Sequence, residues 1–215
     1  MPDNKRWNIG DIFKVFLFYF FMMLVGIPVF LRVSKQIFRF DLIEAFGQNT
    51  ILLSLSLVVN ILTCLYVFYI IRVGYGLPVT SLGFTVHNWK RDVKIGIKHY
   101  LIVLPVIILA GFVVDFVLRI FGIVPEQQDI LNKILNEDSL GVLTFMFFFG
   151  MLAAPVVEEL LFRGFLQPAV RTAFGKLKAI LISGFLFALV HLNAHVFLQI
   201  FILGLLLAYL FEKTE

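Results

Sequence analysis

Long apolar runs alternate with short polar segments along all 215 residues of this sequence. Asp, Glu, Lys and Arg are absent between Lys14 and Arg32, Glu44 and Arg72, Asp138 and Glu158, and Lys178 and Glu212. A helix that spans a bilayer needs about 20 apolar residues, which is the scale of these gaps. The pattern predicts an all-α fold, a polytopic membrane helical bundle with about six transmembrane helices at residues 12–31, 50–72, 99–121, 140–170, 178–193 and 196–211.

The longest polar connection is the segment Arg72–Lys98. Its glycines and Pro78 end the preceding helix, and Asn88 can cap a new one. Apolar residues then recur at helical spacing among several lysines, so residues 86–98 fit an amphipathic helix on an anionic cytoplasmic surface. A simple basic loop fits the same segment equally well.

Three smaller features receive structural interpretations. Asp115 precedes Arg119 by four residues, so we expect a helical ion pair. The segment Pro125–Ser139 is polar with one apolar face and predicts a short surface helix on the outer side. The single cysteine, Cys64, lies within a span, where it fits a small apolar role and excludes an internal disulfide.

Composition and charge support a membrane protein rather than a soluble one. Hydrophobic residues make up 60% of the chain and charged residues 15%, whereas soluble domains are about one quarter charged. Most of the 18 Lys and Arg residues fall on the side of the N-terminus in this topology, which predicts that both termini are cytoplasmic. The net charge of +4 then reflects topology and needs no nucleic-acid partner.

Three charges lie inside an apolar helix, in the stretch "PVVEELLFRGF" at Pro155–Phe165. Ionisable groups at membrane depth are costly and usually face a polar cavity. Glu159 and Arg163 are four residues apart and can pair. Glu158 points about 100° away from that pair, which makes it the carboxylate available for chemistry. The alternative is that all three charges only hold the bundle together.

His191 is the next polar group that can meet Glu158. Gly175 marks a turn between two helices, with Glu158 17 residues before it and His191 16 residues after it. Equal arms of a helical hairpin bring both side chains to one depth. A glutamate beside a neutral imidazole can activate water for hydrolysis. The same two groups could instead hold a metal, His191 and His195 could form a zinc clamp, or the acids could relay protons in a transporter.

Two motifs resemble those of the CPBP family, the intramembrane proteases related to CAAX prenyl proteases and bacteriocin self-immunity (Abi) proteins. The first is Glu-Glu-x-x-x-Arg at Glu158–Arg163, and the second is Phe-x-x-x-His at Phe187–His191. The run Gly204–Thr214 is similar to the family's next helix. The resemblance covers residues 140–215, and Ser81–Asp92 more loosely. It divides one integral membrane domain into N-terminal helices at 1–139 and a catalytic core at 140–215.

The resemblance implies an endopeptidase that cleaves a membrane-associated or lipidated peptide in a cell membrane. Glu158 would activate water with assistance from His191, while Glu159 and Arg163 would shape the motif. Zinc is the expected cofactor for a metalloprotease, and none is needed for a glutamate mechanism.

The family's usual pattern has a further helix carrying His-x-x-x-Asn or His-x-x-x-Asp after the run Gly204–Thr214, whereas this sequence ends at Glu215. We therefore expect either a truncated sequence or a core that lacks oxyanion donors, with low activity in the 215-residue form. A non-catalytic immunity or scaffold protein, which binds a peptide or partner in the membrane, is the alternative function.

Overall fold

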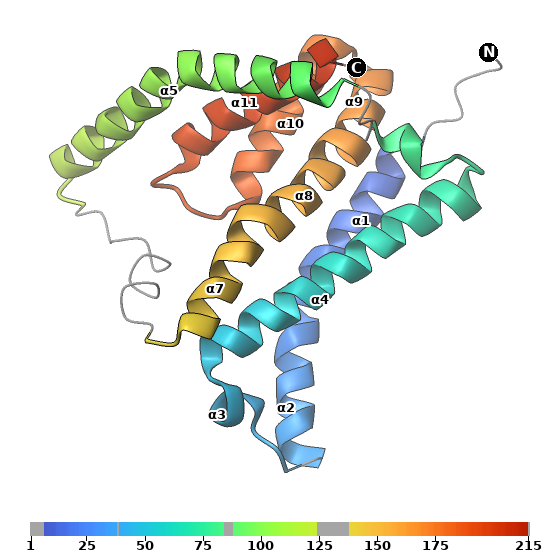
Figure 1. Cartoon of the computed structure of the whole chain (residues 1–215), viewed down its shortest axis with the longest axis vertical. Coiled ribbons are helices and arrows are strands. Elements are labelled where there is room, and N and C mark those ends of the chain that lie inside the picture. Colours follow the sequence, from blue (N-terminus) through green and yellow to red (C-terminus); the bar gives the residue numbers. More distant parts are fainter. Residues whose placement is uncertain (1–6, 38, 84–87, 124–137, 215) are drawn as a thin grey trace. The chain divides into compact units, whose positions relative to one another are not determined.

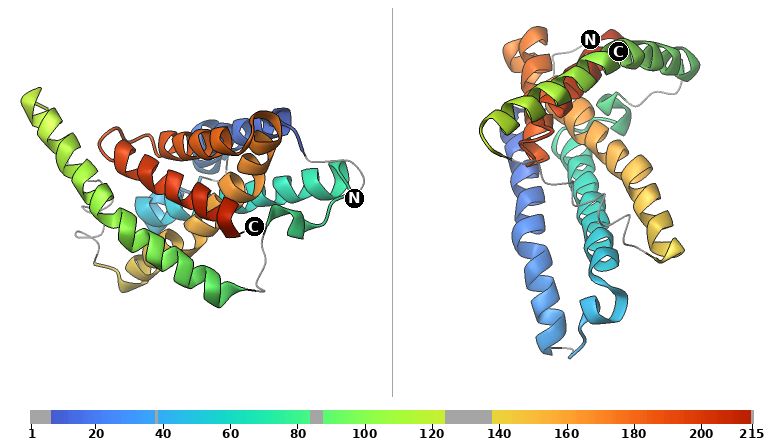
Figure 2. Two further views of the ribbon diagram at one scale, coloured as in Figure 1. Left: turned by 90° about the horizontal axis from the view of Figure 1, so that it is seen from above. Right: turned by 90° about the vertical axis from the view of Figure 1, so that its left-hand side faces the viewer.

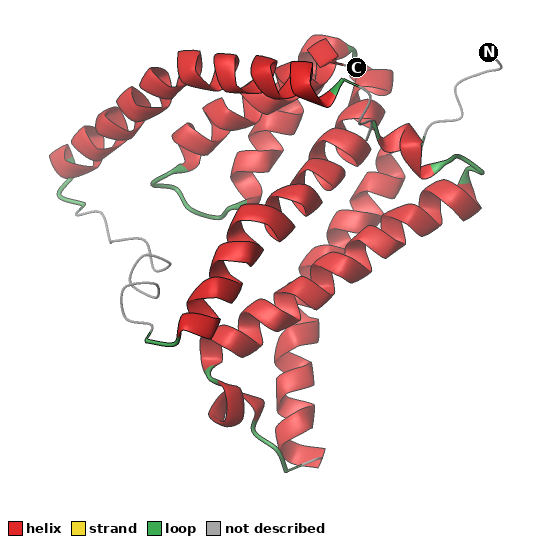
Figure 3. Ribbon diagram, in the orientation of Figure 1, coloured by secondary structure: helices red, strands yellow, loops and turns green. Residues whose placement is uncertain are grey.

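A computed structural model describes residues 7–37, 39–83, 88–123 and 138–214, and every regular element in these ranges is a helix (Figures 1 and 3). Within them, five helical runs are long and apolar enough to cross a membrane: Ile9–Ile37, Gln48–Gly74, Trp89–Ile120, Leu140–Phe174 and Phe197–Thr214. The predicted all-α fold is confirmed, and the chain is a multi-pass membrane protein.

The sixth predicted span, at residues 178–193, corresponds to the shorter helix α10 (Lys176–Val190). Its 15 residues extend about 22 Å at 1.5 Å per residue, less than the roughly 30 Å hydrocarbon core. Because the helix ends before His191, α10 does not reach the length expected of an independent span.

The chain divides into two compact units. Unit 1 comprises residues 1–78 and 127–160, and unit 2 comprises residues 79–126 and 161–215. The predicted division at residue 140, within one integral membrane domain, stays a prediction.

Unit 1 contains α1 (Ile9–Phe21), η1 (Met22–Gly26), α2 (Ile27–Ile37), α3 (Leu42–Phe46), α4 (Gln48–Tyr69), η2 (Ile70–Gly74), α7 (Leu140–Phe148), η4 (Phe149–Ala153) and α8 (Ala154–Glu159). Helix α4 contacts both α1 and the α7–α8 run, so it forms the centre of this unit (Figure 2). The start of α1 is fixed by a capping box, in which Asn8 accepts from the Asp11 amide and Asp11 accepts from the Asn8 amide.

Unit 2 contains η3 (Val79–Leu82), α5 (Trp89–Ile120), most of η5 (Leu160–Leu166), α9 (Gln167–Phe174), α10 and α11 (Phe197–Thr214). Helix α11 packs against both α5 and α10. The predicted turn at Gly175 is confirmed, since its φ of +83° separates α9 from α10. Helices α10 and α11 meet through glycines, because a Cβ on Gly204 would lie 2.9 Å from the Gly184 carbonyl oxygen.

Proline positions explain where several helices widen. Three of the four π-helical segments in the described ranges end two residues before a proline: η1 before Pro28, η4 before Pro155 and η5 before Pro168. Proline lacks an N–H and its ring clashes with the carbonyl four residues earlier, so the preceding turn relaxes to a wider helix. The run 140–170 is therefore less regular than the helix assumed from the sequence.

The basic segment before the third span is helical. Helix α5 is continuous from Trp89 to Ile120, so the loop interpretation is wrong for residues 89–98. Residues 86 and 87 lie outside the described residues, as does nearly all of the predicted surface helix at Pro125–Ser139.

Candidate functional site

Glu158 and Glu159 lie at the end of α8 in unit 1, where both are half-buried. Each has an interaction with its surroundings. The Glu158 carboxylate acts electrostatically on the hydroxyl group of Tyr19, which α1 contributes to the same unit. Sequence reasoning missed Tyr19, because nothing in its local pattern distinguishes it from the aromatic residues around it.

Arg163 lies in η5 and is only 1% exposed. Its Nη2 donates to the Gly204 carbonyl oxygen at 3.2 Å. Its guanidinium carbon lies 4.6 Å from the centroid of the Phe187 ring, which is the geometry of a cation–π contact. The arginine of the first motif therefore contacts both α10 and α11 within unit 2.

His191 follows the last residue of α10 and its side chain is oriented by the helix itself. Its Nδ1 lies 2.7 Å from the Phe187 carbonyl oxygen, four residues earlier. A carbonyl oxygen can only accept, so Nδ1 carries the proton and a neutral ring keeps its lone pair on Nε2. The ring also lies edge-on to Phe187, with 4.9 Å between centroids. The second motif thus presents a base at a defined atom.

The structure brings together three motif residues in unit 2: Arg163, Phe187 and His191. The boundary between the units falls between Leu160 and Leu161. The predicted Glu158–His191 and Glu159–Arg163 pairs each join residues of different units, and both stay predictions.

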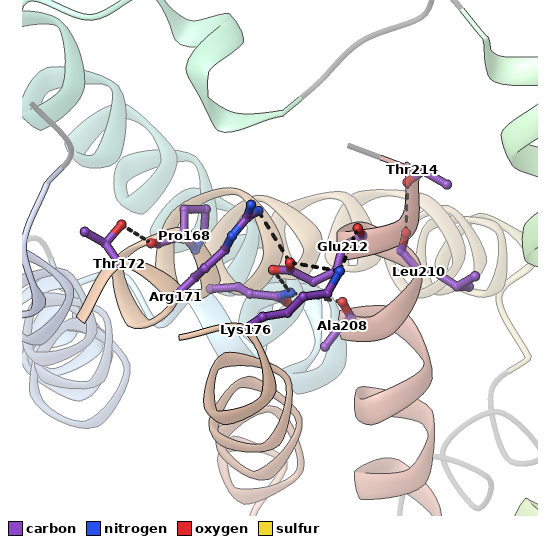
Figure 4. A network of polar contacts seen from close by, with 9 residues as sticks. Pro168, Arg171, Thr172, Lys176, Ala208, Leu210, Glu212 and Thr214 are labelled. Carbon is purple, nitrogen blue, oxygen red and sulfur yellow. Dashed lines mark hydrogen bonds and ion pairs between the residues drawn. The ribbon is translucent and has the colours of Figure 1, made fainter. Parts of the chain in front are cut away.

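A polar ladder continues from Arg163 along the next two turns, and Figure 4 shows its last part, where Arg171 and Lys176 contact Glu212. We define it by three side chains and the α11 positions that they contact, namely Arg163 with Gly204, Gln167 with Ala208, and Arg171 with Glu212. Each partner lies 41 residues further along the chain, so the two helical segments run in the same direction. The ladder holds α11 in a fixed register.

Glu212 is the acid of this ladder, and its side chain is only 1% exposed. Its carboxylate accepts from Gln167 Nε2 at 3.0 Å and lies 3.4 Å from Arg171 Nη1 and 3.8 Å from Lys176 Nζ. Two cations and an amide compensate the loss of hydration that burial imposes. The available sequence signal was the i,i+4 spacing of Arg163, Gln167 and Arg171, but it did not identify Glu212 as the partner of Gln167 and Arg171.

Asp115 has a different partner from the one predicted. Its Oδ1 lies 3.2 Å from Nε2 of His195, not beside Arg119. The ion pair expected from the i,i+4 spacing is therefore wrong, because α5 packs against the region after α10 and offers a closer polar group. Asn193 Oδ1 accepts from the His195 amide and fixes this turn.

The predicted zinc clamp requires His191 and His195 on one helical face. Helix α10 ends at Val190, so the two histidines are not on successive turns of a helix. Within the described ranges, no group of three or more His, Cys, Asp or Glu side chains gathers as a metal site would require. The helical spacing that the His191–His195 clamp requires is therefore not formed, while zinc binding by Glu158 and His191, which belong to different units, stays a prediction.

A comparison with protein families places these residues in context. The model for Type II CAAX prenyl endopeptidase Rce1-like proteins matches residues 140–215. No curated protein and no solved structure matched the chain. The matched region contains both motifs and the whole polar ladder. The resemblance predicted from the two motifs is confirmed over residues 140–215, which are similar to the Rce1-like proteins of the CPBP family.

Proposed function

We propose that this protein is an intramembrane endopeptidase that hydrolyses a membrane-associated or lipidated peptide. The family match supports a CAAX-type protease in general terms. The observation that carries the finer proposal is the contact chain from Arg163 through Phe187 to His191, because it joins the two family motifs physically. It orients one imidazole with its base at Nε2.

In this mechanism, Glu158 is the general base. Its carboxylate removes a proton from a water molecule, whose oxygen attacks the scissile carbonyl carbon. The proton is then delivered to the departing amine as the C–N bond breaks. His191 Nε2 would accept a hydrogen bond from the same water, which orients it and shares the proton. Glu159 and Arg163 would maintain the shape of the motif.

Cleavage of a farnesylated, fluorogenic peptide by the full chain in liposomes tests this assignment. We expect Glu158→Gln and His191→Ala each to lower the rate by about a hundredfold or more, since general-base catalysis typically contributes that much. His99→Ala is the matched control. His99 Nδ1 lies 2.7 Å from the Ile95 carbonyl oxygen, the same local geometry as at His191.

Parental rates in Glu158→Gln or His191→Ala would contradict the mechanism. If the parental protein cleaves nothing and Glu158→Gln keeps peptide binding, the immunity or scaffold alternative replaces it.

Metal dependence has its own readout. The proposed mechanism uses Glu158 and water without zinc, so we expect cleavage to survive dialysis against a strong chelator. Loss of activity that is restored by Zn²⁺ but not by Mg²⁺ would overturn the glutamate mechanism in favour of a metalloprotease.

We also propose that the protein resides in the cell membrane with its N-terminus in the cytoplasm. The distribution of basic residues supports this orientation. Labelling of a cysteine introduced at Asn88, by an impermeant maleimide on intact cells in a Cys64→Ala background, should succeed only after the cells are opened.

A further inference from the structure

The first turns of α5 carry two exposed strips of opposite character. The basic strip consists of Lys90, Arg91, Lys94 and Lys98, and the apolar strip consists of Trp89, Val93, Ile97 and Tyr100. At 100° per residue the basic strip covers an arc of about 100° and the apolar strip an arc of about 80° beside it. Both strips face away from the side of α5 that packs on α11, which is marked by His99 and the buried Ala110.

Helix α5 is too long to lie wholly within a bilayer core. Its 32 residues extend about 48 Å, compared with a hydrocarbon thickness of about 30 Å. Residues 99–114 contain no Asp, Glu, Lys or Arg, so the apolar part of the helix begins just after Lys98. The strips therefore fall where the helix leaves the core, at the level of the phospholipid headgroups.

A second helix adds a cation at this place. Lys213 of α11 donates through Nζ to His99 Nε2 at 3.1 Å, and it lies 5.6 Å from the Tyr209 ring centroid. His99 can accept because its Nδ1 is bound to the Ile95 carbonyl. The contact holds the end of α11 against α5 and brings a positive charge to the same end of α5, on a different side of the helix from the basic strip.

Few acids offset these charges in the described part of unit 2. Asp92 pairs with Arg91, with Nε 3.1 Å from Oδ1. Glu212 is buried and is already engaged by Arg171 and Lys176. In the described part of the chain, Lys90, Lys94, Lys98 and Lys213 form no ion pair with either acid.

We propose that this strip is a binding site for the phosphate groups of anionic phospholipids in the membrane that the protein spans. Each lysine near an anionic leaflet strengthens attraction by about 1 kcal/mol, roughly fivefold. The exposed Trp89 and Tyr100 are the residues that anchor helices at this level. The two strips continue directly into an apolar membrane span, which favours a lipid over a soluble polyanion as the ligand.

Quenching of Trp89 fluorescence by brominated lipids tests the proposal. The sequence has two tryptophans, so a Trp7→Phe background leaves Trp89 as the reporter. The full chain is placed in nanodiscs of phosphatidylcholine that contain an equal fraction of brominated phosphatidylglycerol or brominated phosphatidylcholine. We expect the anionic lipid to quench about threefold or more strongly, and we expect salt to reduce the preference.

Paired variants locate the effect. In the double variant Lys94→Gln/Lys98→Gln, brominated phosphatidylglycerol and brominated phosphatidylcholine should quench Trp89 to the same extent. Arg32→Gln with Arg119→Gln removes the same charge from exposed positions elsewhere and should leave the preference intact. Equal quenching by both lipids in the parental protein, or an equal loss in the control, would overturn the proposal.

A second measurement avoids the Trp7 substitution, since Trp7 is buried. Native mass spectrometry of the parental protein from mixed-lipid micelles should show bound phosphatidylglycerol in several-fold excess over phosphatidylcholine. The Lys94/Lys98 variant should lose this excess. Retention of both lipids in proportion to their supply would contradict a specific site.

Discussion

Two polar clusters join helices in this protein, and they do so in different surroundings. The polar ladder in unit 2 is buried, with Arg163 and Gln167 at most 1% exposed, and it uses backbone carbonyls of α11 as acceptors. In unit 1, Asp11 accepts from the Tyr75 hydroxyl and from Lys14, at a place where Lys14 is 63% exposed. Asp11 itself is only 7% exposed, but water can reach its partner Lys14, whereas Arg163 and Gln167 are both closed to water.

This contrast teaches which polar groups in a membrane bundle determine its packing. A buried donor that loses its acceptor carries the full desolvation penalty, whereas an exposed one exchanges its partner for water. The ladder should therefore govern stability, and the Asp11 cluster should only adjust it.

Arg163→Met is expected to have the largest effect. It keeps most of the side-chain volume but removes the donor to Gly204 and the contact with Phe187. A hydrogen bond from a charged group contributes about 1.5–3 kcal/mol, and a desolvated cation–π contact contributes about 2 kcal/mol more. Thermal unfolding in detergent, followed by size-exclusion chromatography, should show a large fall in stability.

Arg171→Met is the control for this prediction, because the Arg171 side chain is 41% exposed at the end of the same ladder. Arg171→Met should lower the free energy of unfolding much less than Arg163→Met does. Equal losses of stability in Arg163→Met and Arg171→Met would mean that burial does not determine how much each residue of the ladder contributes.

Gly204→Ala is expected to have the next largest effect on stability. The new Cβ would lie 2.9 Å from the Gly184 carbonyl oxygen and 3.2 Å from Phe187 Cδ1, so α10 and α11 must move apart. Overpacking of this kind costs about 1–3 kcal/mol. Gly150→Ala is the matched control, since a Cβ at Gly150 would have nothing within 4 Å. Comparable destabilisation of both variants would refute the close-contact argument.

A double-mutant cycle on Gln167 and Glu212 tests whether the ladder acts as a unit. Gln167→Leu removes the amide donor to the buried carboxylate and should destabilise by about 1–3 kcal/mol. Adding Glu212→Leu should cost less than the sum of the single losses, because both partners of the bond are then gone. Strict additivity of the unfolding free energies would show that the two residues act independently.

The sequence was sufficient for the features that repeat along one segment. Apolar run lengths predicted the helical spans, and Gly175 marked the turn because left-handed backbone favours glycine. Motif spacing also predicted the family resemblance of residues 140–215. Contacts between distant segments were not predictable in the same way. The partner of Asp115 proved to be His195, since local spacing does not reveal which helices pack together.

The candidate site shows the same limit. Arg163 and His191 were named from motifs, but their link through Phe187 and Gly204 depends on how closely α10 and α11 approach. Glu212 was missed for a related reason. Its role follows from a register of 41 residues between two helical segments, and no pattern within either segment encodes that register.

The smallest expected effect concerns Tyr75, which belongs to the partly exposed Asp11 cluster of unit 1. The hydrogen bond to Asp11 raises the pKa of Tyr75 above 10, with burial and the Asp11 charge acting in the same direction. A pKa raised in the folded state means that this contact stabilises fully below the unfolded value near 10 and loses its contribution as pH rises through the folded value. Tyr75→Phe should therefore cost about 0.5–1.5 kcal/mol at pH 8. The stability difference between parental protein and variant should shrink toward zero above pH 10, and a difference independent of pH would show that the Tyr75 ring, rather than its hydroxyl, carries the effect.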